Sequence, residues 1–228
     1  MSKGTRRSVN STLFETPLWN FLITDCPTVD TLPQFKKTIQ KYNCHHVVRL
    51  CESTYPPSEL SDIQCAVLEF EFPDGNKPPK YIIEQWFDLL ESLRPDVFPS
   101  SAQSSQKQVD QQPPTTAMSS LDASTEQADP MKTQTPSTEQ YNPKNPTVCT
   151  HCIAGLGRAP MLVCLAMMAY DYDISGLEVV NTIRKLRPGA LNSEQVRFIM
   201  DFEKERMKLN RKKRMHKHKQ GDSGCSIM

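Results

Sequence analysis

The stretch Thr147-Val-Cys-Thr-His151, followed directly by Cys152-Ile-Ala-Gly-Leu-Gly-Arg158, decides the fold prediction. Its first five residues are mostly apolar or β-branched, which favours a short buried strand. Two glycines follow in the loop, and the apolar run at residues 159–170 is typical of a buried helix. A strand, a glycine-bearing loop and a helix in succession indicate an α/β fold.

The sequence on both sides of this stretch continues the alternation of strands and helices. Short apolar runs at residues 21–24, 47–51 and 65–70 predict buried strands. Helical spacing of Leu32, Phe35, Ile39 and Tyr42, and of the apolar residues within 81–93, predicts helices between and after them. Two more helices are expected at 175–186 and after the cap Asn192-Ser193. We therefore predict a central four- to five-stranded sheet flanked by helices.

One segment differs in composition from the rest of the chain. Of the 48 residues at positions 99–146, 29 are Ser, Thr, Gln or Pro, and large apolar side chains are nearly absent. Such a segment cannot bury enough surface to offset its ordering entropy, so we predict a disordered insertion. The remaining divisions are a variable N-terminal segment at 1–17, a single domain made of 18–98 and 147–209, and a basic tail at 210–228.

Bulk composition limits the class of protein. The 228 residues are 37% hydrophobic and contain no apolar run long enough to cross a bilayer. The first ten residues are polar and lack the apolar centre of a secretory signal. Without such a signal, the eight cysteines are expected to be reduced thiols rather than disulfides.

The loop from Cys152 to Arg158 has the composition of an anion cradle. Gly155 and Gly157 permit backbone angles that turn successive N–H groups inward, and the following helix adds its positive N-terminus. Arg158 supplies a planar fork for two phosphate oxygens. These donors favour the thiolate of Cys152, which can attack phosphorus and form a phosphocysteine. The predicted phosphate-binding residues are Ile153, Ala154, Gly155, Leu156, Gly157 and Arg158. No metal or organic cofactor is needed for this chemistry.

Three plainer interpretations compete with this one. A buried cysteine can precede a glycine turn by chance, and Cys149 with Cys152 also spells C-x-x-C, the spacing of thiol redox sites. No phosphate-type loop follows the second cysteine in redox sites of that kind. Cys44-His45-His46 resembles part of a metal site, but no matching pair of ligands stands at zinc spacing. We therefore predict no metal ligand.

The loop and several other stretches resemble the phosphatases of regenerating liver, prenylated members of the dual-specificity phosphatase superfamily. The resemblance rests on the loop with its following Ala159-Pro160 pair and extends over about residues 18–97 and 147–228. Further matching stretches are Phe21-Leu-Ile-Thr24, Val48-Arg-Leu-Cys51 through Thr54-Tyr55, Gly189-Ala190 with Asn192-Ser193, and the C-terminal cysteine. Most related phosphatases carry Ser or Thr directly after the arginine, and the segment at 99–146 has no counterpart in the family.

The resemblance assigns roles to two further residues. It implies that Asp74, in Phe72-Pro73-Asp74-Gly75, is the general acid, although Pro-Asp-Gly is also an ordinary turn signature. Pro73 and Phe70 replace an aspartate and a tryptophan of the family pattern. The resemblance also implies that Cys51 forms a reversible disulfide with the nucleophile, whereas the residues alone favour a core thiol.

The C-terminus carries a lipidation signal. Cys225-Ser-Ile-Met228 fits the prenylation box, and methionine at its end favours a farnesyl group, which makes a prenyltransferase a predicted partner. Residues 203–219 hold nine Lys or Arg against two Glu. A basic run beside one lipid favours an anionic membrane surface, with a nuclear or nucleic-acid patch as the alternative. We expect peripheral attachment at the cytoplasmic face of plasma and endosomal membranes, and no nucleic-acid partner.

The predicted function is a membrane-tethered protein tyrosine or dual-specificity phosphatase with slow turnover. Its substrate is a phosphoprotein or a phosphoinositide. The resemblance also implies a rival role, a weakly active phosphatase fold that binds cyclin-M magnesium transporters, and it allows a homo-oligomer. One basic pair that contacts the transporter in the family is Arg187-Pro188 here, which weakens the rival interpretation.

Overall fold

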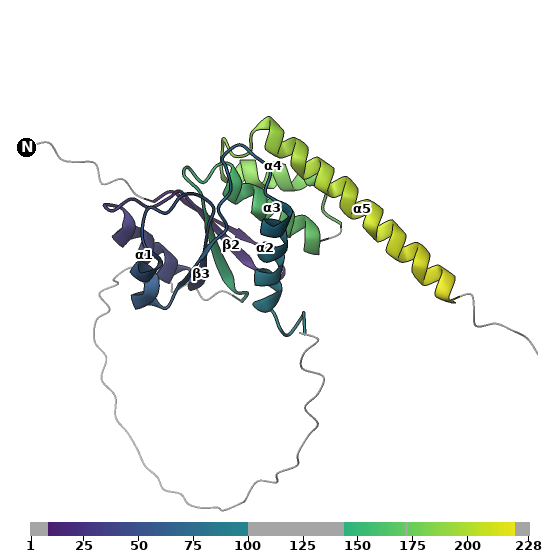
Figure 1. Cartoon of the computed structure of the whole chain (residues 1–228), viewed down its shortest axis with the longest axis horizontal. Coiled ribbons are helices and arrows are strands. Elements are labelled where there is room, and N and C mark those ends of the chain that lie inside the picture. The colour runs from purple at the N-terminus through teal and green to yellow at the C-terminus, as the bar shows by residue number, and fades with distance from the viewer. Residues whose placement is uncertain (1–8, 100–143, 172, 222–228) are drawn as a thin grey trace, which may run out of the picture.

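The computed structural model describes residues 9–99, 144–171 and 173–221 (Figure 1). The domain alternates strands and helices in the order that the sequence predicts. The elements are β1 (Ser11–Glu15), β2 (Asn20–Thr24), α1 (Leu32–Lys41), β3 (Cys44–Arg49), the 3-10 helix η1 (Pro57–Ile63), β4 (Ala66–Glu69), α2 (Lys80–Ser92), β5 (Thr147–His151), α3 (Arg158–Tyr170), α4 (Gly176–Leu186) and α5 (Ser193–Gly221).

A five-stranded sheet forms the centre of the domain, in the order β1-β2-β5-β3-β4. Strand β5 pairs in parallel with β2 on one side and with β3 on the other, and β4 adds a further parallel strand beside β3. Only β1 runs antiparallel, as an edge strand beside β2. The predicted α/β fold with four or five strands is therefore confirmed, and β5 is its middle strand.

Each face of the sheet is covered by its own hydrophobic core. Helices α2, α3, α4 and α5 lie on one face, and α1 with η1 lies on the other (Figure 1). Neighbouring residues of a strand point to opposite faces, so Val148 belongs to the first core and Cys149 to the second. Nearly all of α3 is buried, which explains why its sequence is apolar around the whole circumference.

The structure differs from the sequence prediction in one additional strand and in two element ends. Strand β1 was not expected, because a half-exposed edge strand with Ser11 and Thr12 carries little hydrophobic signal. Strand β3 ends at Arg49, so Cys51 follows the strand instead of ending it. Helix α5 runs to Gly221, into the segment assigned to the basic tail, because its many Lys and Arg residues are good helix formers.

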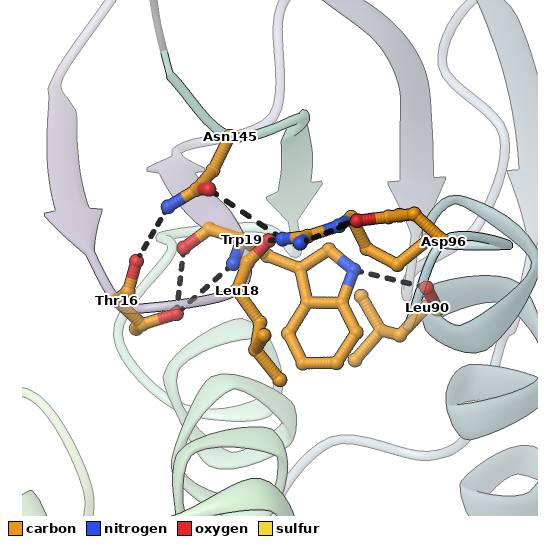
Figure 2. Close-up of polar contacts among 7 residues, drawn as sticks. Thr16, Leu18, Trp19, Leu90, Asp96 and Asn145 are labelled. Carbon is orange, nitrogen blue, oxygen red and sulfur yellow. Dashed lines mark hydrogen bonds and ion pairs between the residues drawn. The ribbon is translucent and has the colours of Figure 1, made fainter. Parts of the chain in front are cut away.

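A set of polar contacts joins the chain on either side of residues 100–143 (Figure 2). Arg94 Nη1 donates to the carbonyl of Leu18 at 2.7 Å and approaches Asn145 Oδ1 at 3.5 Å. The Asn145 amide donates to the carbonyl of Thr16, and Trp19 Nε1 donates to the carbonyl of Leu90, both at 2.9 Å. The chain before the segment and the chain after it are thus joined by hydrogen bonds and belong to one domain. The predicted insertion itself lies almost wholly outside the described residues.

Among the helices that the structure describes, none is both long enough and apolar enough to cross a bilayer.

Candidate active site

The loop that follows β5 lies at the carboxyl end of the middle strand, between the ends of β2 and β3. Its backbone is joined to both neighbours, because Cys26 N donates to Ile153 O at 2.9 Å and Leu50 N donates to His151 O at 3.0 Å. Ligands of open parallel sheets bind in the crevice outside the carboxyl ends of the strands. The loop predicted from its composition therefore occupies the position where this architecture places a site.

Gly155 is required by the geometry of the loop. Gly155 has φ +65°, and a Cβ atom there would lie 2.3 Å from the carbonyl oxygen of Thr24. Real Cβ atoms do not approach backbone atoms so closely, so another residue at Gly155 would move the loop. A Cβ atom on Gly157 would lie 2.7 Å from Nε2 of Gln195, at the start of α5, so a residue there would displace the end of that side chain.

Arg158 opens helix α3 and is fixed from two directions. Its side chain is buried, and Nη1 donates to the carbonyls of Leu50 and Phe72, each at 2.8 Å. Its Nε lies 3.4 Å from Asp74 Oδ1 and has no hydrogen-bond partner among the described residues. The guanidinium therefore links the phosphate-type loop to the segment that carries Asp74, and it keeps donors free for an anion.

Asp74 lies on an exposed turn opposite the loop. Its side chain is 67% exposed, and Gly75, with φ +78°, follows it in the turn. Asp74 and Arg158 line a pocket of about 580 Å³ together with Glu52, Glu71, Phe72, Pro73 and Ile153. The structure thus brings Asp74 and Arg158 to one pocket, and Cys152 lies buried at the head of the same loop. Cys225 lies outside the described residues.

Arg187 is a positioning residue that the sequence analysis did not identify. Its buried side chain donates from Nε to Gly155 O at 2.6 Å and from Nη2 to Ala154 O at 3.3 Å. Nη1 reaches Thr12 Oγ1 of the edge strand at 3.0 Å. These bonds engage two of the loop carbonyls, so we expect the loop N–H groups to remain available to an anion. The available signal in the sequence is a basic residue directly after α4, in the pair Arg187-Pro188.

Behind the nucleophile loop, His151 is held by a buried polar chain. Its Nε2 atom lies 2.8 Å from the hydroxyl of Tyr55, and Arg49 Nη1 donates to the carbonyl of Tyr55 at 2.6 Å. Arg49 also forms an ion pair with Glu69. These contacts fix the backbone between β3 and η1, which carries Cys51, against the start of the loop.

The cysteines fall into different environments. Cys149 points into the core on the α1 face, away from Cys152, and burial raises the pKa of the Cys149 thiol. That arrangement does not support the C-x-x-C interpretation. The Cys51 thiol lies near Cys152 but donates to Cys26 Sγ at 3.8 Å. The pairing of Cys51 with Cys152 stays a prediction.

Comparisons with known proteins agree with this geometry. The protein-tyrosine phosphatase family model matches residues 103–203. A probable protein tyrosine phosphatase type IVA B of Dictyostelium discoideum is 30% identical, with 86% of this chain and 91% of the relative covered. Protein tyrosine phosphatase type IVA 3 of Bos taurus is 31% identical, with 91% and 90% covered. A solved structure of a putative protein tyrosine phosphatase from Leishmania major superimposes with a TM-score of 0.59 at 28% identity, covering 84% of this chain and 97% of that one.

The loop after the middle strand carries Cys152 and the buried Arg158, and relatives of similar length are protein tyrosine phosphatases. The chain belongs to the type IVA, or PRL, family of cysteine-dependent protein tyrosine phosphatases.

Proposed function

We propose that this phosphatase hydrolyses phosphoesters through a phosphocysteine intermediate on Cys152, with Asp74 as general acid and base. In the first step the thiolate attacks phosphorus, the P–O bond breaks, and Asp74 gives its proton to the leaving oxygen. In the second step water attacks phosphorus, the P–S bond breaks, and Asp74 takes a proton from that water. The contact of Arg158 with Asp74 supports this assignment most strongly, because it joins the phosphate clamp to the acid.

Developing charge on the phosphoryl oxygens is met by fixed donors. In this proposal the N–H groups of residues 153–157 and the Arg158 guanidinium donate hydrogen bonds to the phosphate. Arg187 donates to Gly155 O, and the side chain of Gln195 lies beside Gly157. Donors that need no rearrangement during the reaction are usually the largest source of rate enhancement.

A trapping experiment tests whether catalysis or partner binding is the main role. The Cys152→Ser variant keeps the loop but lacks the nucleophile, so it should retain phosphorylated substrates from a cell lysate. Vanadate, which occupies a phosphate site, should release them. The rival role predicts instead that a cyclin-M-type transporter domain is captured and that vanadate-released phosphoproteins or phosphoinositides are absent.

Slow turnover is the second part of the proposal, and it rests on Ala159. Ala159 is buried in the first turn of α3, directly after Arg158. Hydrolysis of the phosphocysteine returns negative charge to the sulfur, and alanine has no hydroxyl to donate to it. Loss of one donor to a developing charge costs roughly 2–4 kcal/mol in strong cases, which slows the step about tenfold to a thousandfold.

Burst kinetics with an aryl phosphate separate the two steps. We expect the protein to release one equivalent of phenol quickly and then to turn over slowly, and Ala159→Ser to raise the slow rate without changing the burst. Asp74→Asn is the matched comparison, because loss of the general acid should slow the burst itself by about 10²-fold or more. A protein without a burst, or a serine variant with an unchanged steady-state rate, contradicts this account.

Membrane tethering is the third part of the proposal. Cys225 fits a prenylation box, and the basic run Arg211-Lys-Lys-Arg214 precedes it. One lipid chain binds weakly, so a basic segment supplies the second attachment. Cys225→Ser should move the protein from the membrane to the supernatant on cell fractionation. Neutralising the basic run should do so partly, and more completely at high salt. Retention of Cys225→Ser on membranes would exclude prenylation as the anchor.

A further inference from the structure

We propose that Cys26, Cys51 and His151 form a binding site for a thiophilic divalent cation, and that Zn²⁺ is the ion it takes. The three side chains come from separate parts of the chain. Cys26 follows β2, Cys51 follows β3, and His151 ends β5. They meet at the carboxyl ends of three adjacent strands, directly behind the nucleophile loop. This site was not predicted from the sequence, because no two of its ligands stand at zinc spacing.

The spacing of the ligand atoms fits zinc better than it fits a disulfide. One ligand atom from each residue lies within 4.8 Å of both others. The two sulfur atoms are 3.8 Å apart. Tetrahedral zinc with Zn–S bonds of about 2.3 Å separates two sulfurs by about 3.8 Å. A disulfide requires about 2.05 Å, and the two sulfurs are far from that distance. The sulfurs are therefore already placed, and the imidazole needs to approach by at most about 1.3 Å.

His151 provides an independent sign of a ligand. The ring is fully buried, and its Nδ1 atom makes no hydrogen bond of normal length with any described residue. A buried polar atom left unpaired is destabilising, so an unpaired ring nitrogen beside two thiols points to a ligand. The other nitrogen, Nε2, is paired with the Tyr55 hydroxyl at 2.8 Å. Metal-bound histidines show this division, with one nitrogen on the metal and the other on a hydrogen-bond partner.

The contacts of the two sulfurs leave them available to a cation. The Cys51 thiol donates to Cys26 Sγ at 3.8 Å, and the Thr54 hydroxyl lies 3.1 Å from Cys26 Sγ. Binding of Zn²⁺ to both sulfurs displaces their thiol protons to the solvent.

The site can be reached, and it can be completed by solvent. Cys26 is half-buried at the surface, whereas Cys51 and His151 lie beneath it. Three protein ligands leave a fourth position of the tetrahedron open to water. Arg158 contributes an opposing positive charge near Cys51. The bound ion would occupy Cys51 and so exclude the predicted disulfide between Cys51 and Cys152.

Cobalt provides the direct test, because tetrahedral thiolate–Co²⁺ absorbs through charge transfer and through d–d bands. The full-length protein, reduced and free of metal, is titrated with Co²⁺ and then with Zn²⁺. We expect one equivalent of tetrahedral Co²⁺, displaced by one equivalent of Zn²⁺. Cys26→Ser and Cys51→Ser should each weaken Zn²⁺ binding at least about 100-fold. Tyr55→Phe keeps the ring and removes the hydroxyl, and it should weaken binding about 10- to 100-fold.

Two control variants identify the ligands. Cys152→Ser and Cys65→Ser should bind Co²⁺ like the unaltered protein, because neither sulfur belongs to the site. Loss of the cobalt spectrum in Cys152→Ser, with retention in Cys26→Ser, would place the ion on the nucleophile and overturn the proposal. An unaltered protein that shows no tetrahedral Co²⁺ spectrum and no Zn²⁺ stoichiometry also overturns it. Neither result depends on the phosphatase activity.

Discussion

Arg158→Lys is expected to lower kcat/KM by about 10²- to 10³-fold, although it keeps the positive charge. The structure explains why charge alone does not suffice. Nη1 of Arg158 already donates to the carbonyls of Leu50 and Phe72. The other guanidinium nitrogens remain available to the phosphate and to Asp74. The single ammonium group of lysine cannot fill two backbone positions and also grip two phosphate oxygens.

A second buried arginine provides the control. Arg206 of α5 donates to the carbonyls of Asp171 and Ile174, at 2.8 and 3.1 Å. Arg206→Lys removes a comparable number of buried hydrogen bonds far from the loop, so it should lower the melting temperature without a matching loss of kcat/KM. Equal losses of activity in the two variants would mean that Arg158 acts through stability. An active Arg158→Lys protein would mean that the clamp has been assigned to the wrong residue.

The strand, loop and helix around Cys152 were predictable from the sequence because local patterns encode them. The run from Thr147 to Arg158 combines a buried strand, two glycines and a helix start within twelve residues, and each feature has a recognisable composition. The helices around it were equally clear, since their apolar residues repeat at helical spacing. The capping box of Ser175 with Glu178 even marks where α4 begins.

Contacts between distant parts of the chain were not predictable in the same way. Arg187 reaches Gly155, which is 32 residues away, and Thr12, which is 175 residues away. Cys26 meets Cys51 and His151 only because β2, β5 and β3 are neighbours in the sheet. No local pattern records the strand order. In the sequence Arg187 therefore resembles an ordinary surface charge, and Cys26, Cys51 and His151 resemble ordinary core residues.

Gly155→Ala is expected to lower kcat/KM at least about 100-fold and to destabilise the domain by about 2–4 kcal/mol. Two separate costs add up here. Alanine at φ +65° is strained by about 1 kcal/mol. Its Cβ would also lie 2.3 Å from the carbonyl oxygen of Thr24 and 2.4 Å from Arg187 Nη2, and overpacking of this kind costs about 1–3 kcal/mol. Relief of the clash requires the loop to leave Arg187, and a displacement of about 1 Å lowers rates about 10²-fold.

Gly189→Ala separates these two costs. Gly189 has φ +83°, and a Cβ atom there meets nothing within 4 Å, so its alanine variant carries the backbone strain without the clash. It should lose about 1 kcal/mol of stability and keep its activity. Thermal unfolding and kcat/KM, measured on both variants, give the comparison. Similar activities in the two would mean that the loop tolerates a side chain at Gly155, and that contact with Thr24 and Arg187 does not hold the loop N–H groups toward the phosphate.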